Sequence, residues 1–258
     1  MSIAADNIDR WTVVDTLREG GGTRARVLRV NLGDRDAVLK DHAGCDPLFS
    51  MLLGRILARR ESKALSYLSS VEGVPLLIGR RGSRALLMEW FSASPFKTLQ
   101  RDTEFWKRFF ITLEQRLAAI HQLGVAHCDL RSLNNVLVND RGEVFIVDFV
   151  ACFFEGQRWN LLSRAVFRRF CRVDRDAVLK LKQQVAPELL SDEQWNRIKH
   201  VGWFARGARN TGKLIRRLRR ILLTRCSGRR ILPHRLADYH RITPVLDRVL
   251  WLFEAVRR

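Results

Sequence analysis

The hydrophobic pattern of the chain changes its period once, near residues 91–96, and this change limits the possible fold more than any other feature. Before it, short apolar runs separated by glycine-containing turns are typical of strands, with one helical pattern between them. After it, apolar residues from Trp106 to Ile120 recur at helical spacing. The pattern predicts an α+β fold in which a small antiparallel sheet precedes a helical part. The predicted strands are 11–14, 25–32, 36–40 and 85–91, and the predicted early helix is 53–68.

Charge divides the second half of the chain further. The net charge is +19, and between Lys199 and Arg258 sixteen Lys or Arg stand against three acids, a net charge of +13. We therefore expect three regions: 10–91, 92–198 and a basic helical extension over 199–258. A surface this basic favours a polyanionic partner, either nucleic acid, anionic lipid headgroups or a phosphorylated glycan. Within 213–223 apolar and basic residues alternate as in a helix at a membrane interface, although a helix packed on the core fits equally well.

Other features bear on location. The apolar runs are far shorter than the ~20 residues that span a bilayer. Residues 1–11 carry charge where a signal peptide would have an apolar core. The five cysteines are odd in number and form no CxxC pair, which argues against a metal site or a disulfide framework. We expect a cytoplasmic protein, with peripheral attachment to the inner face of the cytoplasmic membrane as the further expectation.

Four polar motifs follow one another along 20–148. They are a glycine-rich segment Gly20-Gly21-Gly22-Thr23-Arg24-Ala25-Arg26-Val27, a lysine in Ala37-Val38-Leu39-Lys40, the segment His127-Cys128-Asp129-Leu130-Arg131-Ser132-Leu133-Asn134, and Asp148 in Ile146-Val147-Asp148-Phe149-Val150. Phosphoryl transfer requires a backbone cradle for phosphates, a cation, oxygen ligands for Mg²⁺ and a carboxylate at the attacking hydroxyl. Taken singly, the glycines are an ordinary turn and the lysine an ordinary strand end. Taken in this order, the motifs predict a phosphotransferase.

The motifs resemble the GxGxxGxV loop, the VAIK strand, the HRDLxxxN loop and the DFG segment of the protein-kinase-like superfamily. The resemblance covers about residues 12–150. It implies a two-lobed fold with a small antiparallel-sheet N-lobe and a reduced helical C-lobe, and it implies ATP and Mg²⁺ as cofactors. Asp129 would orient the acceptor hydroxyl and accept its proton, and Arg131 would neutralise charge on the transferred phosphate. Asn134 and Asp148 would hold Mg²⁺.

The same resemblance implies a nucleotide site. Lys40 would bind the α- and β-phosphates and pair with Glu61, because the alternative, Glu72, stands beside the helix-breaking Gly73. The remaining expected contacts are Gly20, Gly22 and Ala25 at the phosphates, Val27, Val38 and Val136 at the adenine, and the backbone of Glu89 and Phe91 at an interlobe hinge.

The sequence also departs from regulated protein kinases. Cys128 replaces an arginine that pairs with a phosphorylated activation loop, and Val150 replaces the glycine of DFG. No APE motif is present, and the segment 151–174 is short for a peptide-docking segment. These features resemble RIO-type atypical kinases and, more closely, bacterial lipopolysaccharide-core sugar kinases. That resemblance implies an envelope glycolipid or sugar as acceptor, met at an anionic membrane surface through the basic extension.

Three alternatives stay open. A RIO-like serine/threonine kinase would take a protein acceptor. A pseudokinase or polyanion-binding scaffold would use the fold without transfer. A nucleic-acid-binding protein would use the basic charge, but the sequence carries no motif that reads bases, so we expect no specific nucleic acid. The sequence indicates no oligomeric state.

Overall fold

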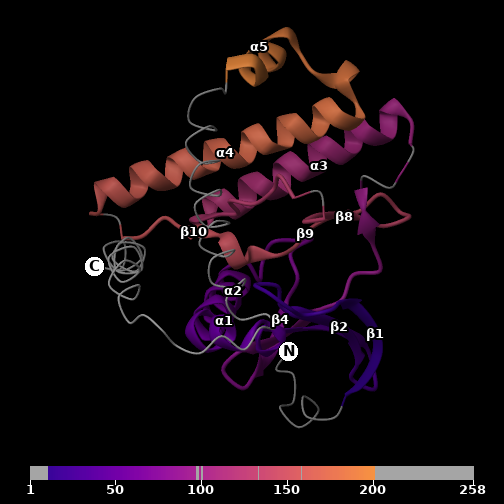
Figure 1. Ribbon diagram of the computed structural model, residues 1–258. Helices are drawn as coiled ribbons and strands as arrows, with labels where there is room; N and C mark the ends of the chain where they lie inside the picture. The colour runs from indigo at the N-terminus through magenta and orange to yellow at the C-terminus, as the bar shows by residue number, and fades with distance from the viewer. Residues whose placement is uncertain (1–10, 97–98, 100, 133, 158, 201–258) are drawn as a thin grey trace, which may run out of the picture.

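The computed structural model describes residues 11–200 except 97–98, 100, 133 and 158. It is a mixed α+β structure in which a small antiparallel sheet lies below a group of helices (Figure 1). The sheet has the strand order β1-β2-β3-β5-β4, so β3 lies in its middle. Its strands are β1 (Thr12–Arg18), β2 (Arg26–Asn31), β3 (Asp36–Asp41), β4 (Leu77–Arg81) and β5 (Ala85–Glu89). Of these, β4 was not predicted from the sequence.

One face of this sheet is covered by a helix that the sequence predicts. Short turns η2 (His42–Gly44), α1 (Pro47–Phe49) and η3 (Ser50–Gly54) lead from β3 into α2 (Arg55–Tyr67). The buried face of α2 includes Ala58, Glu61, Ala64 and Leu65. Glu61 is thus the charged member of an otherwise mostly apolar face. A glutamate in that position needs a partner inside the protein.

The helical part begins with α3 (Thr103–Gln122), whose N-terminus is capped by the Asp102 carboxylate accepting from the Phe105 N–H. A long helix, α4 (Leu161–Val185), lies beside it, and α5 (Asp192–His200) follows (Figure 1). Beyond α3 the helical and basic pattern of the sequence begins only at Asp174. α4 begins earlier because the Asn160 side chain caps it by accepting from the Ser163 N–H. The helix begins with two exposed leucines, Leu161 and Leu162, which hide its start from a periodicity argument.

Short strands and turns connect α3 to α4 and carry the polar motifs of 127–148. They are β7 (Val125–Ala126), β8 (Val136–Val138), β9 (Val144–Ile146), η5 (Phe149–Ala151) and β10 (Phe153–Phe154). Outside this connection, β6 (Ser94–Pro95) precedes α3 and η6 (Pro187–Leu189) follows α4. β8 pairs with β6 and β9, and β7 pairs with β10. The loop 127–135 therefore lies between two small sheets that fix both of its ends.

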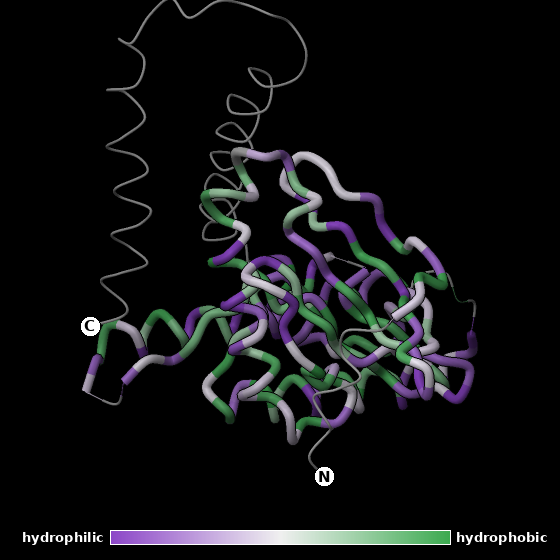
Figure 2. The backbone as a smooth tube through the Cα atoms, turned by 90° about the horizontal axis from the view of Figure 1, so that it is seen from below, coloured by the Kyte–Doolittle hydropathy of each residue, from purple (hydrophilic) through white to green (hydrophobic). Residues whose placement is uncertain are grey.

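The main hydrophobic core joins the sheet, α2, α3, α4 and the small strands, and a second cluster including Leu28, Leu39 and Leu87 covers the opposite face of the sheet. Figure 2 shows hydrophilic and hydrophobic stretches alternating along the described backbone. No helix among the described residues is both long enough and apolar enough to span a bilayer. The predicted basic extension lies outside the described residues from position 201 onward.

Candidate active site

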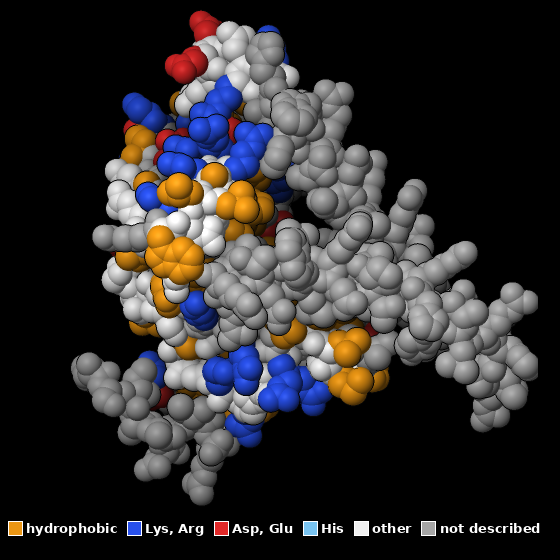
Figure 3. Space-filling model, turned by 90° about the vertical axis from the view of Figure 1, so that its left-hand side faces the viewer, with side chains coloured by type: hydrophobic (Ala, Val, Ile, Leu, Met, Phe, Trp, Pro, Cys, Tyr) orange, Lys and Arg blue, Asp and Glu red, His pale blue; other side chains and the backbone are white. Residues whose placement is uncertain are grey.

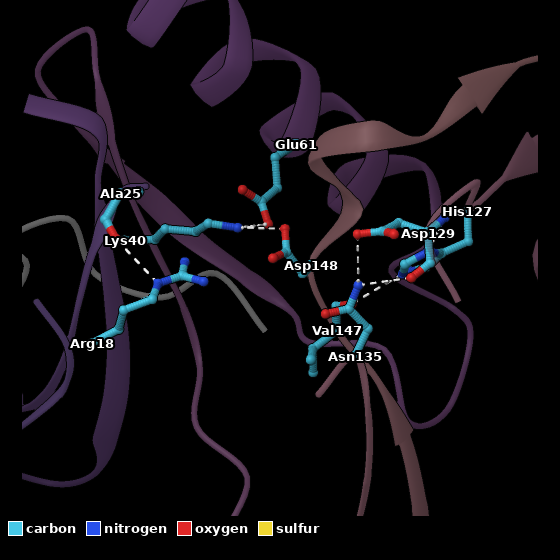
Figure 4. A network of polar contacts seen from close by, with 9 residues as sticks. All are labelled: Arg18, Ala25, Lys40, Glu61, His127, Asp129, Asn135, Val147 and Asp148. Carbon is cyan, nitrogen blue, oxygen red and sulfur yellow. Dashed lines mark hydrogen bonds and ion pairs between the residues drawn. The ribbon is translucent and has the colours of Figure 1, made fainter. Parts of the chain in front are cut away.

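Lys40 lies at the centre of a buried ionic cluster. It projects from β3, and its ammonium contacts the carboxylates of Glu61 on α2 and of Asp148 after β9, each at 2.8 Å (Figure 4). Lys40 is 5% exposed and Glu61 1% exposed. The alternative partner, Glu72, is exposed and pairs with Arg116 instead. The structure therefore brings together Lys40, Glu61 and Asp148 from positions up to 108 residues apart.

The charges of this cluster follow from its burial. Burial alone would lower the pKa of Lys40, but the attraction of Glu61 and Asp148 outweighs it and raises the pKa. Burial also acts on Asp148, yet Lys40 holds the pKa of Asp148 below its usual value. Burial raises the pKa of Glu61, and its Oε2 has no hydrogen-bond partner among the described residues. Lys40 and Asp148 are therefore fixed in their charged forms.

The backbone aims Asp148 at Lys40. Asp148 has φ 68°, in the left-handed region that non-glycine residues rarely adopt. The preceding strand β9 and the following turn η5 hold it there, and Phe149 is completely buried beneath it. The Asp148 side chain is 31% exposed, so one side of the carboxylate faces outward from the cluster.

Asp129 lies near this cluster and is held by Asn135. The Asn135 Nδ2 donates to the Asp129 carbonyl at 3.0 Å and to its carboxylate at 3.3 Å. Asn135 is buried, whereas Asn134, the residue expected from the sequence, is exposed. The turn that leads from Asp129 to the bonded asparagine is one residue longer than expected. In it the Ser132 N–H donates to the Asp129 carbonyl, and the Asn135 N–H donates to the Ser132 carbonyl. Asn135, and not Asn134, therefore stands in the cluster.

The same shift of one residue affects the strand that follows. Val136 was expected at the adenine, but it is completely buried in the main core and offers no surface to a ligand. Val138 points into the core as well. Since side chains alternate along a strand, Leu137, which is half-buried, faces the other side of β8.

His127 links the Asp129 loop to the Asp148 strand. Its Nδ1 accepts from the Asp129 N–H at 3.3 Å, and its Nε2 donates to the Val147 carbonyl at 3.0 Å. The Val147 N–H donates in turn to the Asn135 carbonyl at 2.9 Å. Burial raises the pKa of the Asp129 carboxyl, and the opposite effect of His127 on this pKa is smaller. A carboxylate with a raised pKa near a carbonyl-bonded histidine can accept a proton from a hydroxyl.

Asp174 was missed by the sequence reading, although it supports the whole loop. Its carboxylate accepts from the backbone N–H groups of His127 at 2.7 Å and Cys128 at 2.8 Å, and it lies 3.1 Å from His121 Nε2. Asp174 is 1% exposed. Cys128 has φ 68°, and this bond pair holds the strained backbone in place. An aspartate among the buried positions of α4, between Cys171 and Ala177, was the available signal.

The glycine-rich segment connects β1 to β2, but the N–H groups of Gly21 and Gly22 already donate within the protein. The Gly22 N–H donates to the Asp46 carboxylate at 2.9 Å, and the Gly21 N–H donates to the Arg24 carbonyl at 3.2 Å. At Gly20 a Cβ atom would lie 2.2 Å from the Gly44 carbonyl oxygen, so close approach of two chain segments requires glycine there. Ala25 is buried. In this structure the segment is bound to the turn after β3.

The other expected nucleotide contacts lie on the face of the sheet that carries Lys40, and at and just after the end of β5. Val27 and Val38 are half-buried on β2 and β3. The Glu89 N–H donates to the Leu76 carbonyl, and the ring of Phe91 stacks on Phe145 with centroids 4.1 Å apart. Arg131 is exposed beside Asp129 in the sequence.

No family model matches the chain. A stretch of 85 residues is 33% identical to the probable serine/threonine-protein kinase mkcD of Dictyostelium discoideum, and the match covers 30% of this chain and 13% of that protein. The chain thus matches only a small part of the length of this relative. This partial similarity indicates kinase-like character for part of the chain.

Proposed function

We propose that the protein is an ATP-dependent kinase with a two-lobed protein-kinase-like arrangement. The observation that carries the proposal is the buried Lys40, which is held between Glu61 and Asp148, with Asp129 and Asn135 close to the same place (Figure 4). A structural ion pair would need one carboxylate for one lysine. A lysine with two carboxylates, one of them partly exposed, fits a site that receives a further cation and a polyanion.

The residues fit Mg²⁺ as the cofactor. Asp148 uses Oδ1 for Lys40 and faces outward, and Asn135 uses its amide nitrogen for Asp129, which leaves its carbonyl oxygen as an acceptor. Carboxylate and amide oxygens are the hard ligands that Mg²⁺ takes. Bound there, Mg²⁺ would neutralise charge on the phosphates of ATP. We assign the metal to Asp148 and Asn135, in place of the pair Asp148 and Asn134.

The chain's own groups then have distinct tasks. Lys40 binds the phosphates of ATP, Glu61 keeps Lys40 pointed at them, and Leu137 takes the place expected for Val136 at the adenine. Asp129 orients the acceptor hydroxyl and takes its proton as the hydroxyl oxygen bonds to the γ-phosphorus and the bond to ADP breaks. Asn135 and Asp174 keep Asp129 in position.

The test is phosphate transfer from γ-labelled ATP into separated lipid, glycan and protein fractions of the source cell. We expect label in one fraction with the wild type and a loss of several powers of ten in rate with Asp129→Ala. Tight ATP binding without transfer in any fraction would favour the pseudokinase alternative. No ATP binding at all would overturn the proposal.

For the acceptor we propose an envelope glycolipid met at an anionic membrane surface. An exposed apolar group at the start of α4 supports this choice, since Trp159, Leu161 and Leu162 are 70%, 71% and 77% exposed. Arg168, seven residues after Leu161, and Arg172, four residues later, continue the exposed face of the same helix. The corresponding side of the molecule carries Lys and Arg beside hydrophobic side chains (Figure 3). Apolar and cationic groups together are typical of surfaces that lie on anionic bilayers.

The protein acceptor of a RIO-like kinase is the second candidate, and vesicle binding separates the two. We expect wild type to sediment with anionic vesicles and a Trp159→Ser, Leu161→Ser, Leu162→Ser variant to sediment at least tenfold less. A matched control replaces the exposed Val13 and Val14 of β1 by Ser. Equal sedimentation of the α4 variant and the control would remove the support for a membrane acceptor. The proposed role of 213–223 in the same binding lies outside the described residues.

A further inference from the structure

A second cation faces the same side of the sheet as Lys40. In the strand register Arg18 of β1 lies opposite Val27 of β2, and Val27 lies opposite Lys40 of β3. Residues directly opposite one another on neighbouring strands project to the same face. An irregularity between Thr16 and Arg18 in the pairing of β1 precedes this row. Arg18 therefore belongs to the face that carries Lys40.

The guanidinium of Arg18 is oriented but only partly used. Its Nε donates to the Ala25 carbonyl at 3.2 Å, which holds the side chain along the glycine-rich segment. Its two terminal nitrogens have no acceptor among the described residues. Figure 4 shows the Arg18 and Lys40 side chains running in the same direction, toward Asp148. A guanidinium has five donors, so several remain for a ligand.

The glycine-rich segment offers few free donors to a phosphate, so a second cation would help to bind one. The N–H groups of Gly21 and Gly22 donate to the Arg24 carbonyl and to Asp46, so in this structure they are not directed at a ligand. Asp46 also places a negative charge at that segment. A phosphate chain that enters beside Lys40 would therefore need another source of donors and positive charge.

We propose that Arg18 is a second phosphate-binding residue, which contacts the phosphate chain of the nucleotide together with Lys40. The proposal rests on the proposed function, since it assumes a nucleoside triphosphate as the ligand. A guanidinium can donate two parallel hydrogen bonds to one phosphate, which an ammonium cannot do. The competing role is structural, in which Arg18 only ties β1 to Ala25.

The test compares affinities for ATP and for adenosine in purified full-length protein. We expect Arg18→Gln to raise the Kd for ATP about 10- to 100-fold while the Kd for adenosine changes less than twofold, because only ATP carries the phosphates. Arg18→Lys should recover part of the loss. The matched control is Arg35→Gln, which removes an exposed charge from the turn between β2 and β3.

The outcomes separate this inference from the proposed function. Equal weakening of ATP and adenosine binding in Arg18→Gln would mean that Arg18 only supports the structure, and an unchanged Kd for ATP would mean that it does not bind phosphate. Either result would overturn the inference while wild-type ATP binding stands. A wild type that binds ATP no better than adenosine would overturn the proposed function as well.

Discussion

The Lys40 half of the candidate site and the Asp129 half are held by different parts of the structure. Lys40 projects from the central strand of the sheet and meets Glu61 on a packed helix, so regular elements set both positions. Asp129 lies on a loop whose shape depends on two side chains, Asn135 from within the loop and Asp174 from α4. The first half is fixed by the register of a sheet, and the second by individual hydrogen bonds.

The largest expected effects come from removing the central group of each half. Lys40→Met and Asp129→Ala should each lower the rate of phosphate transfer by several powers of ten. Lys40→Met should also weaken ATP binding at least tenfold, because the phosphates lose their cation, whereas Asp129→Ala should bind ATP nearly as well as wild type. Rates from labelled ATP and affinities from calorimetry check this. Equal ATP affinities in the two variants would contradict the assignment of nucleotide binding to the Lys40 half and of transfer to the Asp129 half.

The next largest effect concerns the support of the loop. Asp174→Ala leaves the N–H groups of His127 and Cys128 buried without an acceptor, and it removes the partner of His121. We expect the free energy of unfolding to fall by about 3 kcal/mol. Transfer should fall more than ATP affinity, since the Lys40 half is intact. Urea unfolding measures the first effect, with Asp176→Ala as control, since Asp176 is a less buried carboxylate of the same helix that pairs with Arg197 of α5. A loss of stability no greater than in the control would contradict the supporting role of Asp174.

Much of the Lys40 half could be predicted from the sequence, because strand and helix periods carry positional information over several residues. The pairing of Lys40 with Glu61 was expected from the resemblance to the kinase motifs, and the structure brings the two residues together. The Asp129 half could be predicted only in outline. A turn can gain one residue without any change in its polar composition, so the adjacent Asn134 and Asn135 are equivalent in sequence and differ only in the folded loop.

Contacts between distant segments were also beyond reach of the sequence pattern. Asp174 is 47 residues from His127, and Asp46 is 24 residues from Gly22, so neither contact follows from local spacing. Arg18 lies between the predicted strand 11–14 and the glycine-rich segment and was assigned no role, because only the irregular pairing of β1 decides which face its side chain takes. The side-chain and backbone bonds that hold the site are therefore a property of the folded chain.

Low pH should lower the stability of the Lys40 half of the site through His42, which directly follows β3. Burial, with help from Lys40, lowers the pKa of His42 to about 4, and both ring nitrogens lack a hydrogen-bond partner among the described residues. The folded protein favours neutral His42, so its contribution to stability is complete above about pH 6.5 and is lost as the pH falls toward 4. For a pKa difference of this size the loss is at most about 3 kcal/mol.

The measurement is the free energy of unfolding of wild type and of His42→Leu between about pH 7.5 and about pH 4. This interval includes the pKa of His42 in the unfolded and in the folded state. The carboxylates, Asp148 among them, are present in both proteins, so the difference between the two curves isolates His42. We expect His42→Leu to lose less stability than wild type over this interval. Parallel curves would show that His42 does not resist protonation in the folded state.

The smallest expected effect decides which asparagine belongs to the site. Asn135→Ala removes the bond to Asp129 and an oxygen ligand for Mg²⁺, so transfer should fall about 10- to 100-fold and recover partly at higher Mg²⁺. Asn134→Ala is the matched control, since Asn134 is the same residue type one position earlier and is exposed. Its rate should stay within about twofold of wild type, as is usual for an exposed side chain without a buried contact. Initial rates across a magnesium titration compare the two. If Asn134→Ala were the slower variant, the loop would place the earlier asparagine at the metal when nucleotide is bound, and the register of 129–137 in this structure would not be the active one.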